Sequence, residues 1–355
     1  MAQKKNLALV IVVAFVVTLL TACGGSAAQF DTKSYNFVTT VTLSGDQKGE
    51  MIIANNKAMT AASGGVVTIN QFDAGQFGND AECLEAVATG IAGLFLGDSS
   101  AISVMVPQTG ILSIPFQVTS PETSNWAIDQ MKHQFNDYFH QKGLHILGFA
   151  GNDFRQVSTT KPVKDPDDLK GLSLRVMENK YQMAYWRALG INPTPLSLTE
   201  VYLALQQSML DGQDVHINMF MNRKFCEVQK NFVFTNAIPT YDILVCNYAD
   251  YQSLSAANRE LMDKYGKDFV DGMNKTVKLM VADRINEMTR DYGVTVTRFS
   301  DEQLARMRNT GAPVVIDMLR QEFGNELVDM WIAICAQAEA NKDAIIAGTY
   351  TGSYK

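Results

Sequence analysis

The sequence predicts an α/β protein built from two domains. Over the first 150 residues, strand-like and helix-like segments follow one another in the order strand, helix, strand, helix, strand. This order is typical of an α/β domain with a largely parallel sheet. A second α/β unit begins near residue 154, and a chain of 355 residues exceeds one comfortable core. A proline-free run over 255–292 would exceed ~50 Å as one helix, so we expect it to pass between the domains.

The first domain starts with weakly alternating residues over 35–43, which predict a strand. A helix over 50–62 would end at Gly64 and Gly65. Asn79 and Asp80 favour the start of a helix that reaches Ala88, because an acidic group is stabilising at a helix N-terminus. The remaining expected elements are strands over 66–72, 91–96 and 145–150, an apolar run over 102–114 and a helix over 126–141.

The second unit begins with a strand over 173–177 and a helix over 181–189. Two prolines predict a loop over 190–195, and Asp211 and Gly212 would end a helix over 200–210. The apolar run over 242–247 is typical of a buried strand. Ser255 is a good N-cap for the long helix, and helices over 301–308 and 314–341 would cover the second domain.

The N-terminus has the pattern of a lipoprotein signal peptide. Lys4 and Lys5 precede an apolar run over 7–20, which is shorter than the roughly 20 residues that span a bilayer. The run over 20–23 then matches a lipobox that ends in Cys23. We therefore expect a signal peptide over 1–22, a lipidated tether over 23–33, and an extracytoplasmic protein anchored to the cell membrane through lipid on Cys23. An uncleaved anchor or a plain signal peptide is the alternative.

Charge and cysteine content narrow the possible partners. The formal net charge is −7, and loss of Lys4 and Lys5 with the leader makes the mature chain more acidic. Such acidity argues against a nucleic-acid partner and against an anionic membrane surface. The other four cysteines are far apart and form no CxxC motif, so we expect free, buried thiols rather than a disulfide framework. They are Cys83, Cys226, Cys246 and Cys335.

Arg175 is the most informative single residue. It interrupts an apolar strand pattern between Leu174 and Val176. A guanidinium seldom lies in a buried strand without an anion beside it. Its planar group can bind a carboxylate through two hydrogen bonds, so the pattern indicates a carboxylate site. A structural ion pair with Glu178 or Asp214 is the alternative.

Four ordered motifs resemble the solute-binding proteins of TRAP transporters, which are tripartite, ATP-independent uptake systems for organic acids. They are DLKGLSLRV over 168–176, ALGINPTPL over 188–196, EVYLALQQSMLDGQD over 200–214 and KFCEVQK over 224–230. Two weaker matches precede them, AGQFGND over 74–80 and IPF over 114–116. The likeness therefore spans about residues 35–335.

The resemblance implies a two-lobed, periplasmic-binding-protein-like (Venus flytrap) α/β fold with a long domain-spanning helix. Lobe I would comprise residues 34–152 plus 241–280, and lobe II residues 153–240 plus 281–355. The family places Arg175 as the main carboxylate clamp. In sialic-acid receptors of this family, an Arg at the position of Arg155 and acids at the positions of Asp80 and Asp98 also line the cleft.

Departures from the family pattern concern specificity. Val215 replaces an Asn that hydrogen-bonds the substrate, Leu198 replaces a Phe of the sialic-acid receptors, and Glu178 replaces a neutral pocket residue. These changes argue against sialic acid and favour a smaller or less polar acid such as a dicarboxylate, an oxo acid or an aromatic acid. Glu178 could also admit an amino group. His216 and Tyr241 are further pocket candidates.

The implied function is capture of a small carboxylate, hinge closure, and delivery to the small and large TRAP membrane subunits. No cofactor and no metal site are expected. A lipoprotein that senses a ligand and signals to a membrane partner is the alternative. An enzyme, such as a hydrolase or lyase, is not expected because the sequence has no GxSxG, HExxH or P-loop motif.

Overall fold

The computed structural model describes residues 30–45 and 47–354. These residues form a nine-stranded mixed sheet with the order β2-β1-β3-β8-β4-β7-β5-β6, and β9 pairs with β8. The strands at the two ends are parallel, but β3, β8, β4 and β7 pair antiparallel. The α/β fold class is confirmed, whereas the expected largely parallel sheet is wrong at the centre. The strands are β1 (Lys33–Val38), β2 (Val67–Phe72), β3 (Leu94–Asp98), β4 (Leu144–Thr159), β5 (Ser173–Val176), β6 (Asn192–Pro195), β7 (Gly212–Val215), β8 (Asn231–Asn247) and β9 (Thr295–Arg298).

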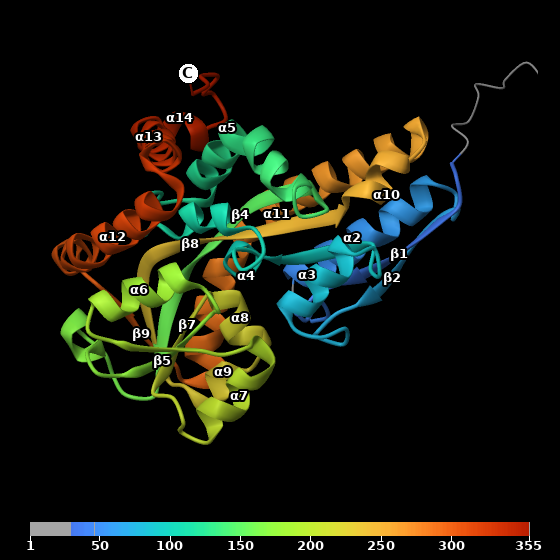
Figure 1. Ribbon diagram of the computed structural model, residues 1–355. Coiled ribbons are helices and arrows are strands. Elements are labelled where there is room, and N and C mark those ends of the chain that lie inside the picture. Colours follow the sequence, from blue (N-terminus) through green and yellow to red (C-terminus); the bar gives the residue numbers. More distant parts are fainter. Residues whose placement is uncertain (1–29, 46, 355) are drawn as a thin grey trace, which may run out of the picture.

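Two long central strands connect the two lobes (Figure 1). The first part of β4 and the last part of β8 pair beside β3, whereas their other ends pair beside β7 and β9. Where these two parts meet, the pairing of β4 with β8 changes register at a bulge from Gly151 to Phe154. Bulges bend a strand and increase its twist, so the bulge lies where the chain passes from one lobe to the other. Both strands are longer than the predicted strands over 145–150 and 242–247.

The first lobe forms largely as predicted. Its helices are α2 (Gln47–Ala62), α3 (Asp80–Ala88), α4 (Ser99–Ile102), the 3₁₀ helix η1 (Pro107–Ser113) and α5 (Pro121–His140). Asn79 and Glu82 form a reciprocal capping box at the start of α3, which satisfies two backbone donors and confirms the predicted helix start. The predicted first strand ends earlier, at Val38.

The second lobe contains η2 (Pro166–Leu169), α6 (Lys180–Ala188), α7 (Leu198–Gln206), α8 (Ile217–Asn222) and α9 (Phe225–Val228). The predicted loop over 190–195 is wrong, because Asn192–Pro195 forms strand β6. Its prolines are tolerated since β6 is the last strand in the sheet order and pairs only with β5 among the described strands.

The long helix is a single element, α11 (Ala256–Tyr292), and Ser255 accepts a hydrogen bond from Asn258 N at its start. It follows the short helix α10 (Tyr248–Ser253) and packs on α2 and β4 of one lobe and on α8 and α9 of the other. A Cβ atom at Gly266 would lie 2.2 Å from the Leu147 carbonyl oxygen. Gly266 therefore allows close packing on β4, which needs a residue without a side chain.

The C-terminal helices tie the two lobes together. Helix α12 (Asp301–Phe323) packs on α6, while α13 (Asn325–Ala340) and α14 (Lys342–Ile346) pack on α5 (Figure 1). The expected break near residue 310 is wrong, because α12 continues through Pro313. Val315 and Leu319 are fully buried beyond the proline, and this burial offsets the backbone hydrogen bond that proline removes.

Cys83, Cys226, Cys246 and Cys335 are free and buried, as predicted. Within the described ranges, no helix is both long and apolar enough to cross a bilayer. The signal peptide and Cys23 lie outside the described residues.

Candidate ligand-binding site

Two adjoining pockets lie between the lobes and share Asp80, Arg175, Met177 and Leu198. The inner pocket encloses about 490 Å³ between atoms and the outer pocket about 380 Å³, part of each open to solvent. The inner pocket is also lined by Thr40, Val41, Lys48, Gly97, Asp98, Arg155, Val215, His216, Met219 and Asp242.

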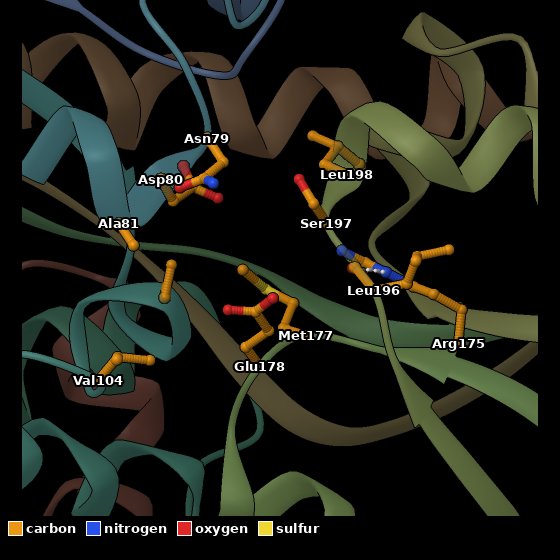
Figure 2. A pocket seen from close by; sticks show the side chains of 11 residues that line it. Asn79, Asp80, Ala81, Val104, Arg175, Met177, Glu178, Leu196, Ser197 and Leu198 are labelled. Atoms are coloured by element: carbon orange, nitrogen blue, oxygen red, sulfur yellow. Dashed lines mark hydrogen bonds between the residues drawn. The ribbon is translucent and has the colours of Figure 1, made fainter.

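Arg175 reaches both pockets from β5, and in the outer pocket it lies opposite Asp80 at the start of α3 (Figure 2). Its side chain is 3% exposed, and its Nε donates to the Leu196 carbonyl oxygen at 2.9 Å. It forms no ion pair with any described residue. The alternative of a structural ion pair with Glu178 or Asp214 is therefore not found among the described residues. Burial, followed by the nearby Arg155 cation, lowers the pKa of Arg175 to about 10. Arg175 is thus a buried cation whose terminal nitrogens are left to face the pocket.

Arg155 lines the same pocket but is held by protein groups. Its Nε pairs with the Asp214 carboxylate, and a terminal nitrogen donates to the Asp214 carbonyl oxygen at 3.0 Å. The other terminal nitrogen lies 3.5 Å from Asp98. Asp214 also accepts a hydrogen bond from Trp186 Nε1 at 2.6 Å. Arg155 is therefore fixed by an anion from β7, and its capacity for a ligand is smaller than that of Arg175.

Asp80 and Asp98 both stand at helix starts that face the cleft. Asp98 caps α4, since its Oδ1 accepts from Ser100 N at 2.7 Å. Asp80 accepts from Thr40 Oγ1 at 2.7 Å. Burial raises the pKa of Asp80, and the Asp98 carboxylate raises it further. Both acids therefore line the inner pocket, as the sequence predicted.

The buried pair of Lys48 and Asp242 was missed by sequence reasoning. Lys48 Nζ lies 2.7 Å from Asp242 Oδ2, and the two side chains are 2% and 6% exposed. Lys48 stands in the first turn of α2 and Asp242 in the middle of β8. No sequence pattern connects them, because the pairing depends on how α2 packs near the sheet.

The other predicted residues differ in their placement. Val215 and Leu198 form apolar walls, and His216 lines the inner pocket. Burial lowers the pKa of His216 well below its ordinary value, with Lys48 adding to the effect, so this imidazole is neutral.

Glu178 lies at the rim of the outer pocket and is exposed. Tyr241 lines neither pocket. It is buried on the far side of its strand, where its ring contacts Phe149 edge-to-face. The structure therefore brings seven of the eight predicted residues to the cleft and leaves Tyr241 in the core.

Asp153 lies at the bulge in β4, and one of its carboxylate oxygens has no partner among the described residues. Burial raises its pKa from 3.8 to about 6. A raised carboxyl pKa adds stability that is complete below pH 3.8 and lost as the pH rises through 6. We expect Asp153→Asn to stabilise the protein on the order of 2 kcal/mol at pH 7.5 and to have little effect at pH 4. Urea unfolding at both pH values measures this, and an equal effect at both would contradict it.

Similarity to known proteins identifies the family. The model for bacterial extracellular solute-binding proteins of family 7, DctP, matches residues 39–322. A solute-binding protein of Verminephrobacter eiseniae is 32% identical over 248 residues, which are 69% of this chain and 72% of the relative. The sialic acid-binding periplasmic protein SiaP of Vibrio cholerae is 25% identical over 244 residues, covering 66% and 74%.

A solved structure has the same fold. The sugar acid-binding protein DctPAm of Advenella mimigardefordensis, in complex with galactonate, is similar with a TM-score of 0.82 and 22% identity, over 87% of this chain and 99% of that chain. The long domain-spanning helix, the two lobes and the family match agree with one another. The chain belongs to the DctP-type solute-binding proteins of TRAP transporters, family 7 of the bacterial extracellular solute-binding proteins.

Proposed function

We propose that this protein is the extracytoplasmic receptor of a TRAP-type secondary transporter and captures an organic acid through Arg175. The observation that carries the proposal is a guanidinium that is 3% exposed, lacks an ion pair among the described residues and lines both pockets. An unpaired buried charge is costly, and a bidentate carboxylate offsets that cost. The ligands of two similar proteins, sialic acid and galactonate, are carboxylic acids.

Capture would proceed by hinge closure. The strands β4, with its bulge between Gly151 and Phe154, and β8 beside it pass from one lobe to the other and would be the connections that bend. Helix α11 packs on both lobes. A ligand that contacts both lobes binds the closed form better and shifts the population toward it. The closed form would then dock on the membrane subunits, and ion coupling there would drive uptake. A ligand-induced fall in the radius of gyration in solution scattering tests the closure.

The receptor function is tested by a thermal-shift screen over organic acids, sugars and cations. A ligand at one hundred times its Kd stabilises the folded state by about 2.7 kcal/mol, which gives a shift of several degrees. We expect carboxylates alone to shift the melting temperature. A shift with sugars or cations and with no acid would overturn the clamp.

Lipid on Cys23 would hold the receptor at the membrane surface. A single acyl chain gives only marginal membrane binding, whereas two or more give stable anchoring. We expect Cys23→Ser to move the protein from the membrane fraction to the soluble extracytoplasmic fraction and to abolish incorporation of a labelled fatty acid. Unchanged fractionation of the variant would show that another segment provides the anchor.

A further inference from the structure

The charges at the inner pocket are unbalanced toward acid. Lys48 and Asp242 form a close pair and cancel. Arg155 is one cation between two carboxylates, since it contacts both Asp214 and Asp98. With Asp214, which is buried behind the lining, counted in, these five groups carry one uncompensated negative charge.

Arg175 and Asp80 are the other charged groups of the inner lining, and His216 is neutral. Arg223, which lies outside the lining, also interacts electrostatically with Asp80. The carboxylate of Asp73 interacts with Arg223 as well and offsets its charge. The formal charges of Arg175 and Asp80 sum to zero, although the two form no ion pair, so the formal negative charge persists. The exposed Glu178 at the rim of the outer pocket adds to it.

A ligand carboxylate bound to Arg175 increases this imbalance. The Arg175 charge would then be shared between the ligand and Asp80, which leaves the carboxylates of Asp80 and Asp98 without a full counter-charge. Placing like charges together in a cleft that closes over the ligand is costly. A second carboxylate on the ligand would increase the cost, whereas a cationic group would remove it.

We propose that the ligand is a zwitterion whose carboxylate binds Arg175 and whose protonated amine faces Asp80 and Asp98. This inference rests on the proposed function and specifies its substrate class. An ammonium group has three donors and needs acceptors once it leaves water. Asp80 uses one oxygen for Thr40 and keeps the other for a ligand. Asp98 uses Oδ1 for Ser100 N, and its Oδ2 lies 3.5 Å from a terminal nitrogen of Arg155, so an ammonium group would share that oxygen with Arg155.

The pKa of Asp80 depends on both Asp98 and Arg175, as expected for groups that line the same pocket. Burial raises the pKa of Asp80, Asp98 raises it further, and the Arg175 cation opposes the rise. The two acids and the arginine line one pocket even though they come from α3, β3 and β5. The inner walls of Val41, Met177, Leu198, Val215 and Met219 are apolar and suit the carbon chain between the two charged ends.

The test is calorimetric titration of the mature protein with ligands matched in length. Each set contains an amino acid, the corresponding hydroxy acid and the corresponding dicarboxylate, such as 4-aminobutanoate, 4-hydroxybutanoate and succinate. Sets of α-, β-, γ- and longer amino acids cover the length of the pocket. We expect an amino acid to bind at least tenfold tighter than its dicarboxylate and tighter than its hydroxy acid. A dicarboxylate or hydroxy acid that binds as tightly as every amino acid would overturn the proposal.

Two conservative variants separate charge from structure. Asp98→Asn keeps an acceptor for Ser100 N, and Asp80→Asn keeps one for Thr40, while each removes a negative charge. We expect both variants to reduce the preference for the amine by about tenfold, and an unchanged preference contradicts the assignment. Binding to Arg175→Ala and to the wild type distinguishes failure of the zwitterion proposal from failure of the receptor function. If it abolishes binding of a dicarboxylate that wild type prefers, only the zwitterion is wrong; if no acid binds wild type, the receptor function is wrong as well.

Discussion

Arg175→Ala is expected to abolish measurable binding of the acid while the protein stays folded. Truncating one partner of a buried, hydrogen-bonded charge pair costs about 2–5 kcal/mol, which is roughly 30-fold to several thousand-fold in Kd. Within the part of the chain that the structure describes, the Arg175 guanidinium donates one hydrogen bond, to the Leu196 carbonyl oxygen at 2.9 Å. Its removal therefore costs little stability, because no described carboxylate depends on it for an ion pair.

Arg175→Lys is the informative second variant. Lysine keeps the charge but not the planar group that meets both carboxylate oxygens, so we expect an intermediate Kd. Arg187→Ala is the matched control, since Arg187 is exposed in the last turn of the neighbouring helix α6. Titration calorimetry of the four proteins measures the effect. Wild-type affinity in Arg175→Ala would refute the clamp even though the family assignment stands.

Asp214→Ala is expected to have the largest effect on stability. The Asp214 carboxylate is fully buried and accepts from both Arg155 and Trp186. Its removal leaves the buried Arg155 guanidinium with the more distant Asp98 as its one carboxylate contact among the described residues, and leaves the Trp186 indole donor without its acceptor. Breaking a buried ion pair in this way costs about 3–5 kcal/mol.

Asp214→Asn separates the charge from the hydrogen bonds, because the amide oxygen can still accept from Trp186. We expect it to lose less stability than the alanine variant. Asp329→Ala is the surface control, since its pair with Arg320 is half exposed and such pairs contribute little. Urea denaturation of each protein measures the difference. Equal losses for Asp214→Ala and Asp329→Ala would show that the buried network is not stabilising.

The features that the sequence predicted are those with a local cause. The capping pattern at Asn79 predicted the start of α3, and the missing prolines and the Ser255 cap predicted α11. Arg175 was found because a charge interrupted an apolar strand. In each case the residues that determine the feature lie within a few positions of it, or within one helix.

The features that were missed depend on residues far apart in the chain. Strand β4 continues through Asn152, Asp153 and Gln156, which look like loop residues. The polar side chain of Gln156 is satisfied inside the sheet, where its Oε1 accepts from Thr235 N and Asn236 N. Tyr241 was placed in the pocket because it precedes an apolar strand, but the alternation along β8 turns it toward Phe149.

The central strands also have a consequence for how the chain folds. Residues 94–98 of β3 pair with residues 242–246 of β8, so all of β5, β6 and β7 lie in the chain between these partners. Pairing across so long a separation requires closure of a large loop, which slows folding. The sheet of the first lobe cannot be completed until residue 246 is available for pairing, whereas β5, β6 and β7 pair over shorter separations. A fragment that ends before β8 would therefore expose the unpaired edge of β3 and aggregate.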